Sequence, residues 1–310
     1  YYMFGLVFSL IFVILVVSAI IYFKVAERFN IIDKPNERSS HTRVTLRGGG
    51  VIFFIGVVLY FLFFGYSHPL FFAGLVLIAG ISFIDDIADV PSRYRIVVHF
   101  AAMMLMFYDC GFYVLPWYYT VIALIVGTGI INAWNFMDGI NGITGGYNLV
   151  VIGSFWYVNN FVVEFIDNNF LYVIALALVV FNIFNFRVKA RCFAGDVGSV
   201  TIAFIVVFLM SRLIIVSGNF SWIALLMVYG VDSVQTILYR LHLRENIFKA
   251  HRRHLYQLLA NERGLPHPVV SGIYMVAQVV ISASFIALGA TFGNFVVLAI
   301  LSGSLWWLGR

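Results

Sequence analysis

The chain has 310 residues, of which only 11% are Lys, Arg, Asp or Glu and 62% are hydrophobic. Soluble domains are roughly 25% charged, so these few charges could not cover a soluble globule of this size, and disorder is excluded by the high hydrophobicity. Two cysteines exclude a secreted disulfide scaffold. The composition therefore predicts a polytopic membrane protein. Its apolar runs are continuous and do not alternate at period two, which predicts an all-α helix bundle and not a β-barrel.

Apolar stretches without charges predict about eleven transmembrane helices, because a helical span needs about 20 apolar residues. Two long stretches count twice, since Ser67-His68-Pro69 and Gly293-Asn294 interrupt them. The first stretch is predicted to be a span and not a signal peptide, because basic residues follow it and none precede it. The predicted spans are 1–23, two within 48–84, 96–108, 110–137, 148–159, 168–186, 200–216, 220–238 and two within 269–309.

The charges predict the orientation. If the spans alternate, 18 of the 19 basic residues fall on one side, which the positive-inside rule makes cytoplasmic. The N-terminus is then outside and the C-terminus cytoplasmic. This topology explains the net charge of +5 without nucleic-acid binding, and it favours contact with anionic lipids. We expect one membrane domain, 1–310, whose active site is formed by the cytoplasmic loops 24–47, 85–95, 132–147, 187–197 and 239–268.

The first polar cluster is Asp85, Asp86 and Asp89, at the inner end of the third predicted span. Carboxylates this close repel one another unless a cation or basic groups compensate them, and Arg93 and Arg95 are near in sequence. The cluster indicates a base or a metal-proximal acid in phosphate chemistry. The alternative is a solvated helix end.

The second cluster lies in 132–142, where Asn132, Asn135, Asp138 and Asn141 alternate with two glycines. Asn and Asp supply the oxygen ligands that Mg²⁺ prefers. A polar turn is the alternative, since Asn and Gly are common turn residues. Four polar residues at helical spacings exceed what a turn requires, so we favour a functional role.

The third cluster is 193–199, in which Asp196 could ligate a metal and the following helix N-terminus could receive phosphate. Asp196 as a plain helix cap is the alternative.

The fourth cluster is His251, Arg252, Arg253 and His254, which suits a pyrophosphate. A solvated basic run beside the membrane is the alternative. Nearby, Asp232 lies on a polar helix face that bundle packing explains.

Together with Asp33-Lys34-Pro35-Asn36, these clusters occur in an order that resembles the polyprenyl-phosphate N-acetylhexosamine-1-phosphate transferase superfamily, glycosyltransferase family 4. That family includes the phospho-N-acetylmuramoyl-pentapeptide transferase and the bacterial enzymes that start O-antigen, enterobacterial common antigen and teichoic acid linkage units. Each motif alone is weak, whereas five in order along nearly the whole chain are specific.

The resemblance implies that undecaprenyl phosphate attacks the β-phosphorus of a UDP-sugar, so that UMP leaves and undecaprenyl-diphospho-sugar forms. We favour direct displacement over an aspartyl-phosphate intermediate. Such phosphoryl transfer depends on alignment and charge neutralisation. The implied cofactor is Mg²⁺ bridging the pyrophosphate, with Mn²⁺ as a substitute. The carrier lipid is expected to enter through a groove between spans.

The resemblance also implies roles for single residues. It assigns the metal to Asn135 and Asp196, and it assigns the deprotonation or positioning of the lipid phosphate to Asp85, with Asp86 in support. Asp138 would assist near the metal or substrate. Among the implied substrate-binding residues, Phe193 would stack on the uracil and Asn141 would contact the uridine end. The phosphates or the sugar would be held by His251, Arg252, Arg253 and His254.

The subgroup follows from the last loop, where His-Arg-Arg-His-Leu-Tyr-Gln resembles the enzymes that start surface polysaccharides more than the muramoyl enzymes, which carry adjacent histidines. Asp138 is typical of bacterial members. The resemblance thus implies a bacterial inner-membrane enzyme of lipopolysaccharide, capsule or other cell-envelope synthesis, and a homodimer by analogy. N-acetylglucosamine is the first choice of sugar, followed by N-acetylfucosamine and N-acetylquinovosamine.

Other functions fit the sequence less well. The muramoyl-pentapeptide transferase stays the alternative within the family. A flippase or transporter of lipid-linked sugars would need polar groups deep in the spans, which are scarce here. A CDP-alcohol phosphotransferase would need a spaced-aspartate motif that the sequence lacks. A scaffold would not need Asp85, Asn135 and Asp196 together.

Overall fold

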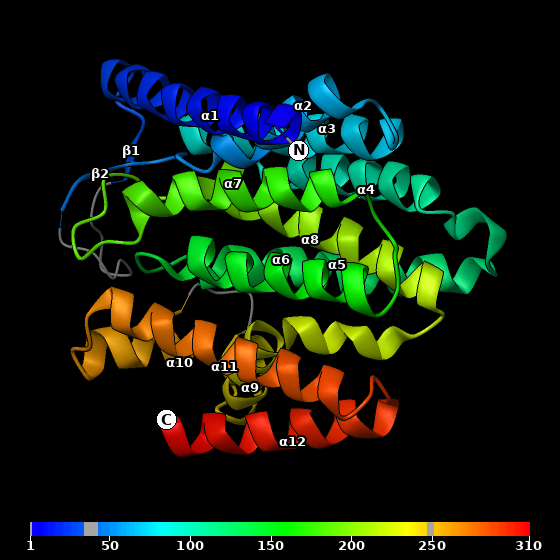
Figure 1. The fold of residues 1–310 in the computed structure, drawn as a ribbon. Coiled ribbons are helices and arrows are strands. Elements are labelled where there is room, and N and C mark those ends of the chain that lie inside the picture. Colours follow the sequence, from blue (N-terminus) through cyan, green and yellow to red (C-terminus); the bar gives the residue numbers. More distant parts are fainter. Residues whose placement is uncertain (1, 34–42, 247–250) are drawn as a thin grey trace.

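The computed structural model describes residues 2–33, 43–246 and 251–310, and these form a bundle of helices that lie side by side (Figure 1). The long helices are α1 (Tyr2–Arg28), α2 (Val51–Phe64), α3 (Pro69–Ala88), α4 (Ser92–Asp109), α5 (Trp117–Met137), α6 (Ile143–Phe161), α7 (Asn168–Asn185), α8 (Gly195–Ser217), α9 (Met227–His242), α11 (His267–Ala287) and α12 (Phe292–Gly309). Short turns of helix are η1 (Phe112–Val114), η2 (Phe220–Leu226), α10 (Leu255–Gln257) and η3 (Leu258–Glu262). Strands β1 (Ile32–Asp33) and β2 (Thr45–Leu46) pair antiparallel.

The prediction of an all-α polytopic membrane protein is confirmed. Among the described residues, eight helices are long and apolar enough to cross a membrane, with η2 and α9 counted as one. Each of the eleven predicted spans overlaps a helix, but α2, α4 and α6 are not among the eight. The count of eleven and the orientation therefore remain predictions.

The helices extend further into the polar clusters than the sequence suggested. Helix α3 continues to Ala88 and α5 to Met137, so the connections that follow them are shorter than the predicted loops 85–95 and 132–147. Helix α6 already begins at Ile143, after Gly142 turns the chain at a φ of +87°. The first two polar clusters are consequently held largely on helix ends, which fix side chains more firmly than loops do.

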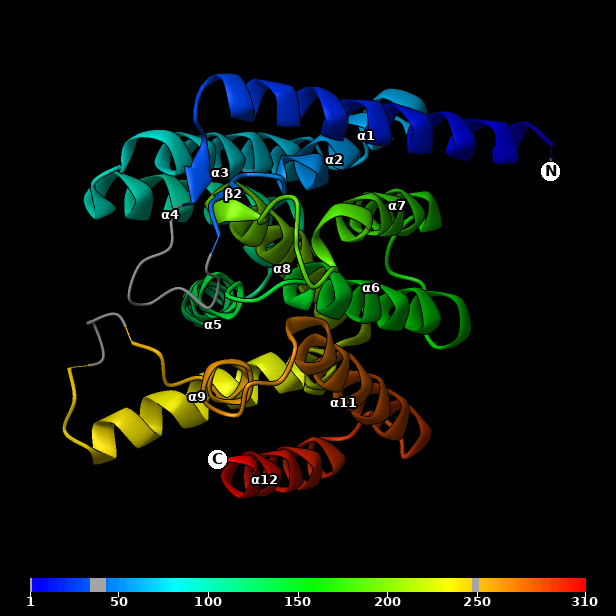
Figure 2. The same ribbon diagram turned by 90° about the vertical axis from the view of Figure 1, so that its left-hand side faces the viewer.

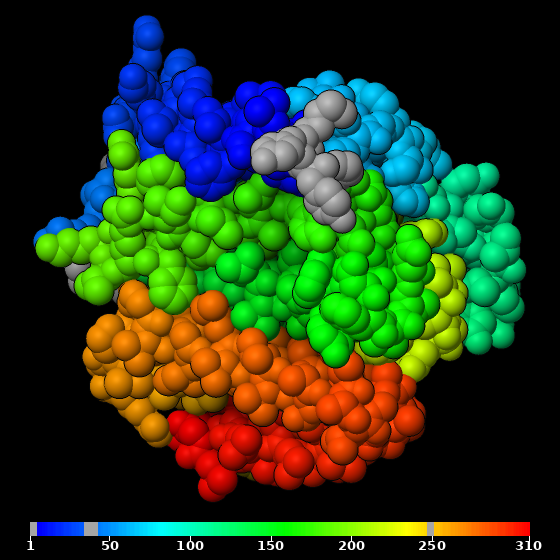
Figure 3. Space-filling model, in the orientation of Figure 1, coloured from blue at the N-terminus to red at the C-terminus, as the bar shows by residue number. Residues whose placement is uncertain are grey.

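Helix α8 is the centre of the bundle (Figure 2). Its residues from Val197 to Met210 are all buried, because α8 is apolar all round and is packed against α2, α3 and α5. Helices α1 and α12 lie at opposite edges, and a space-filling view shows them bordering one face, with α6, α7 and α11 between them (Figure 3).

A glycine contact fixes the N-terminus of α8. The amides of Gly49 and Gly50 donate to the carbonyls of Phe193 and Ala194 at 2.8 and 3.0 Å. A Cβ atom on Gly50 would lie 2.2 Å from the Cα of Gly198. The clash is with a backbone atom, which cannot move aside as a flexible side chain could. Gly49 and Gly50, which lead into α2, thus allow the two chain segments to touch.

This contact makes Gly50→Ala severely destabilising. We expect a loss of more than about 3 kcal/mol, or no folded protein, because overpacking against backbone cannot relax. Thermal unfolding in detergent measures it. Gly80→Ala is the matched control, since a Cβ there meets nothing within 4 Å. Equal unfolding temperatures for the two variants would contradict the role of the contact.

Candidate active site

Asp86 holds the start of α8. Its carboxylate accepts hydrogen bonds from the backbone amides of Asp196 at 2.8 Å and Val197 at 2.9 Å, and it pairs with the Arg47 guanidinium at 2.7 Å. The first amides of a helix lack partners within the helix and carry a partial positive charge, so a buried carboxylate there is stabilising. Asp86 thereby sets the position of Asp196.

Asp85 faces a different set of partners. Its carboxylate accepts from the amide of Val90 at 2.7 Å and from Arg95 at 2.6 Å. The same guanidinium lies 3.8 Å from the carboxylate of Asp196. Arg95 therefore brings Asp85 and Asp196 to one site although they come from α3 and α8.

Asn135 of α5 completes this group. Its amide donates to Asp196 at 3.0 Å and to the hydroxyl of Ser199 at 3.1 Å. One turn further on, Asp138 accepts a 2.5 Å hydrogen bond from Thr144. Burial, together with the negative charges of Asp196 and Asp86, raises the pKa of Asp138 to about 7 despite the Thr144 bond. The second and third sequence clusters therefore meet, as the prediction of one active site requires.

Two arginines balance the carboxylates. Arg47 pairs with Asp86 and lies 3.5 Å from Asp196, while Arg95 pairs with Asp85. The sequence pointed to Arg95 as a near neighbour of the acids but missed Arg47. The only signal for Arg47 was its place directly before Gly48-Gly49-Gly50, of which Gly49 and Gly50 bond to the segment that begins α8.

The Asn135 and Asp196 pair fits a Mg²⁺ ion. Within the part of the chain that the structure describes, no three His, Cys, Asp or Glu side chains form a metal-binding group. Mg²⁺ does not need such a group, since it is commonly held by one or two carboxylates together with water and substrate phosphates. The amide of Asn135 already touches Asp196, and a half-turn of that amide would present its oxygen instead of its nitrogen.

Asn141 and Phe193 lie in neighbouring connections. Asn141 is buried, and its side-chain amide donates to the carbonyls of Arg187 and Val188 at 2.8 and 3.1 Å. It thereby joins the α5–α6 connection to the α7–α8 connection. Phe193 is partly buried, and its backbone pairs with Leu46 at 2.8 Å. The predicted contacts of Asn141 and Phe193 with uridine remain predictions.

The last cluster is not four free cations. Burial and the nearby charges of His254 and Arg240 lower the pKa of His251 to about 4, so its ring is neutral at pH 7. Arg253 pairs with Glu245 at 2.6 Å, and His254 is buried. Arg252 is exposed. The cluster therefore presents fewer free positive charges than its sequence suggested.

This cluster is tied to the end of α5. The hydroxyl of Tyr256 donates to the carbonyl of Phe136 at 2.9 Å, and the Phe136 ring lies 6.4 Å from those of His251 and His254. Since Phe136 follows Asn135, the last loop borders the carboxylate group. The first-loop motif cannot be placed in the same way, because Lys34-Pro35-Asn36 lies outside the described residues.

The raised pKa of Asp138 predicts a pH effect on stability. Between about pH 4 and pH 7 the unfolded chain loses the Asp138 proton while the folded protein keeps it, so this residue lowers stability as the pH rises. Asp138→Asn removes the effect. In metal-free detergent solution the variant should match the unmodified chain near pH 4 and unfold at a higher temperature near pH 8. A difference in unfolding temperature that is independent of pH would contradict the assignment.

Comparisons with known proteins agree with this geometry. The family model described as "Glycosyl transferase family 4" matches residues 68–214. This range contains Asp85, Asp86, Asn135, Asp138 and Asp196. The chain is similar to an undecaprenyl-phosphate alpha-N-acetylglucosaminyl 1-phosphate transferase from Yersinia pestis, with 25% identity over 76% of this chain and 71% of that protein. It is also 24% identical to a probable undecaprenyl-phosphate N-acetylglucosaminyl 1-phosphate transferase from Bacillus subtilis (strain 168), over 90% of this chain and 83% of the relative. With its motifs in order and its polar residues gathered at one end of the bundle, the chain is similar to glycosyl transferase family 4 over residues 68–214 and to these two transferases over most of its length.

Proposed function

We propose that this protein transfers N-acetylglucosamine 1-phosphate from UDP-N-acetylglucosamine to undecaprenyl phosphate, releasing UMP. The observation that carries the proposal is the convergence of Asp85, Asn135 and Asp196 from three helices, with Arg47 and Arg95 between the carboxylates. The names of the similar proteins support this choice of sugar and carrier. The inner membrane, the cytoplasmic side, a homodimer and a pathway in surface polysaccharide synthesis are parts of the same proposal.

The site suits the charges of this reaction. Asn135 and Asp196 would hold Mg²⁺, which neutralises the pyrophosphate when bound. Asp85 would accept the proton of the lipid phosphate or orient that phosphate, and the 2.6 Å pair with Arg95 fixes the direction of its carboxylate. A guanidinium group can donate two parallel hydrogen bonds to a phosphate. Arg47 and Arg95 could therefore use some of their N–H groups to bind the substrate phosphates. Asp86 would contribute indirectly, because it holds the N-terminus of α8 and with it Asp196.

Asp138 would handle a proton near the metal pair. With a pKa of about 7 it can gain or lose a proton at the pH of the cytoplasm, which is the property of an effective acid or base. Phe193 and Asn141 would lie toward the uridine. The cluster 251–254 would face the phosphates or the sugar.

An apolar groove supplies a place for the carrier chain. A hollow of about 530 Å³ lies between α5, η2, α9 and α12, with Ile130, Ala133, Trp134, Val234 and Ile237 among its lining residues. Val234 and Ile237 are exposed, so the groove opens on the side of the bundle. Its Ala133 and Trp134 immediately precede Asn135. We place the polyprenyl tail here, with its phosphate toward Asp85.

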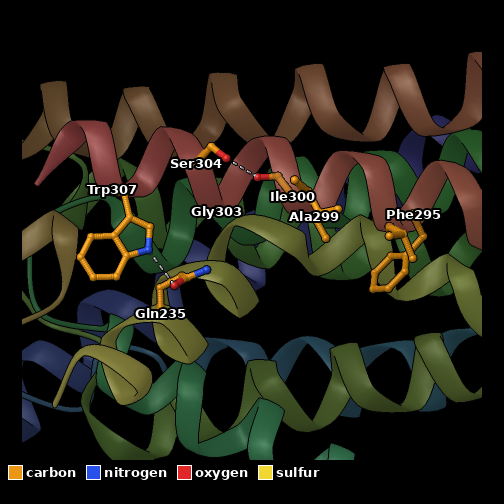
Figure 4. A pocket seen from close by; sticks show the side chains of 8 residues that line it. Gln235, Phe295, Ala299, Ile300, Gly303, Ser304 and Trp307 are labelled. Atoms are coloured by element: carbon orange, nitrogen blue, oxygen red, sulfur yellow. Dashed lines mark hydrogen bonds between the residues drawn. The ribbon is translucent and has the colours of Figure 1, made fainter. Parts of the chain in front are cut away.

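A second hollow adjoins this groove, since Gln235, Phe295 and Ala299 line both. It measures about 440 Å³ between α9 and α12 and is lined by Gln235, Ile300, Ser304 and Trp307 among others (Figure 4). In this close-up the Trp307 indole donates to Gln235 at 3.2 Å and so closes one side of the hollow. We assign it no substrate.

The function is tested by exchange of labelled UMP with UDP-sugars, using purified protein, undecaprenyl phosphate and Mg²⁺. We expect exchange with UDP-N-acetylglucosamine, and a loss of at least about 100-fold in Asp196→Asn because charge neutralisation at the transferring phosphate fails. Asp89→Asn is the control, since Asp89 is exposed at the end of α3. The proposal fails if the unmodified protein exchanges UMP with no UDP-N-acetylhexosamine.

The groove is tested separately with Gly129→Leu, which puts a side chain into open space in the groove wall. We expect the KM for undecaprenyl phosphate to rise by about tenfold and the KM for the UDP-sugar to stay the same. Gly80→Leu on α3 is the control, because that glycine also faces open space but lies outside the groove. An unchanged KM for the lipid in Gly129→Leu would place the tail elsewhere.

A further inference from the structure

Asp232 is a buried acid that the proposed reaction does not use. It lies in α9 and is 1% exposed. One carboxylate oxygen accepts from the backbone amide of Leu255 at 3.0 Å, the indole of Trp306 at 3.0 Å and the hydroxyl of Thr236 at 3.2 Å. The other oxygen accepts from the hydroxyl of Tyr274 at 2.7 Å. The predicted role of its helix face in bundle packing is therefore confirmed, since α11 and α12 are both attached to it.

Packing alone does not explain a carboxylate at this place. A buried charge is costly unless several hydrogen bonds compensate it, and an apolar residue could join helices at less cost. The donor that packing does not need is Leu255, because it belongs to the last loop and directly follows His254. Asp232 thus connects the bundle to the cluster 251–254.

His254 is the residue that this connection places. Its Nδ1 atom lies 3.5 Å from Asp232, and its ring is 3% exposed. The other ring nitrogen of His254, Nε2, is buried and has no hydrogen-bond partner within the described residues. Buried polar atoms are nearly always paired, so an unpaired one needs an explanation such as a missing ligand.

The surroundings of His254 point toward the active site. Its ring lies 5.0 Å from that of His251 and 5.8 Å from that of Tyr256, whose hydroxyl donates to the carbonyl of Phe136 beside Asn135. A carboxylate on one nitrogen of an imidazole fixes the ring orientation and leaves the other nitrogen for a ligand. Here Asp232 occupies the Nδ1 side.

We infer that Asp232 is a positioning residue, which holds His254 so that its Nε2 atom contacts the phosphate or the sugar of the nucleotide substrate. The inference rests on the proposed function for the identity of that substrate. The positioning itself rests on the contacts of Asp232 with Leu255 and His254.

The first experiment is a double-mutant cycle with Asp232→Asn and His254→Ala, read as kcat and as KM for UDP-N-acetylglucosamine and for undecaprenyl phosphate. We expect Asp232→Asn to lower kcat/KM for the UDP-sugar by at least about tenfold and to leave the KM for the lipid unchanged. In the His254→Ala background the same change should cost less than about twofold, because the two residues act as one unit. Equal losses in both backgrounds would overturn the inference.

Trp306→Phe and Trp307→Phe provide a matched pair in case Asp232→Asn does not fold. Each removes one indole donor from α12, but Trp306 donates to Asp232 of α9. Trp307 donates instead to Gln235, also of α9 (Figure 4). We expect Trp306→Phe to lower kcat/KM for the UDP-sugar by several-fold and Trp307→Phe to stay within about twofold of the unmodified protein. Equal effects would reduce Asp232 to a packing residue.

A second readout does not depend on turnover. Amide hydrogen exchange of the segment 251–258 should speed up in Trp306→Phe, since the Leu255 amide loses a firmly held acceptor, and should not change in Trp307→Phe. Unchanged exchange in Trp306→Phe would contradict the positioning. An inactive unmodified protein with the expected exchange pattern would instead contradict only the proposed substrate.

Discussion

The hydrogen bonds and ion pair of the Asp86 carboxylate are the interactions on which the candidate active site depends. This carboxylate joins α3 to the first amides of α8 and also binds Arg47, whose chain segment leads into the glycine contact with α8. Three parts of the chain far apart in sequence are thereby fixed at one point. Asp196 lies at that point because its own backbone amide is one of the bound donors. The metal-binding candidate is therefore placed by its backbone before its side chain takes part in any chemistry.

Low charge makes each remaining charge effective. The site contains four acids, Asp85, Asp86, Asp138 and Asp196, and two arginines, in a chain that is only 11% charged. Electrostatic interactions strengthen as water is excluded, and unpaired charges become costly for the same reason. The arginines lower the repulsion among the acids while no cation is bound. The acids still outnumber the arginines, so the site keeps a net negative charge that favours a metal ion, and the metal ion can in turn bind the two phosphates.

Much of the fold followed from the sequence, because apolar runs must become helices in a membrane. The proximity of the polar clusters could also be predicted, because the alternating spans put all of them on the same side of the membrane. The division of work between Asp85 and Asp86 could not, since adjacent residues on a helix point about 100° apart and their partners on α4 and α8 depend on packing. Arg47 and the buried amide of Asn141 were equally hidden, because long-range contacts leave no local pattern in one sequence.

If the cluster 251–254 contacts the sugar nucleotide as proposed, the attachment of Leu255 to Asp232 has a consequence for exchanging this loop among relatives. The loop before α10 is not a self-contained cassette, since the groups that secure it come from α9, α11 and α12. A chimera that receives only this loop from a relative would combine the relative's loop with the recipient's own residues at positions 232, 274 and 306. Successful transplantation would have to move the whole C-terminal third of the chain as one inherited unit.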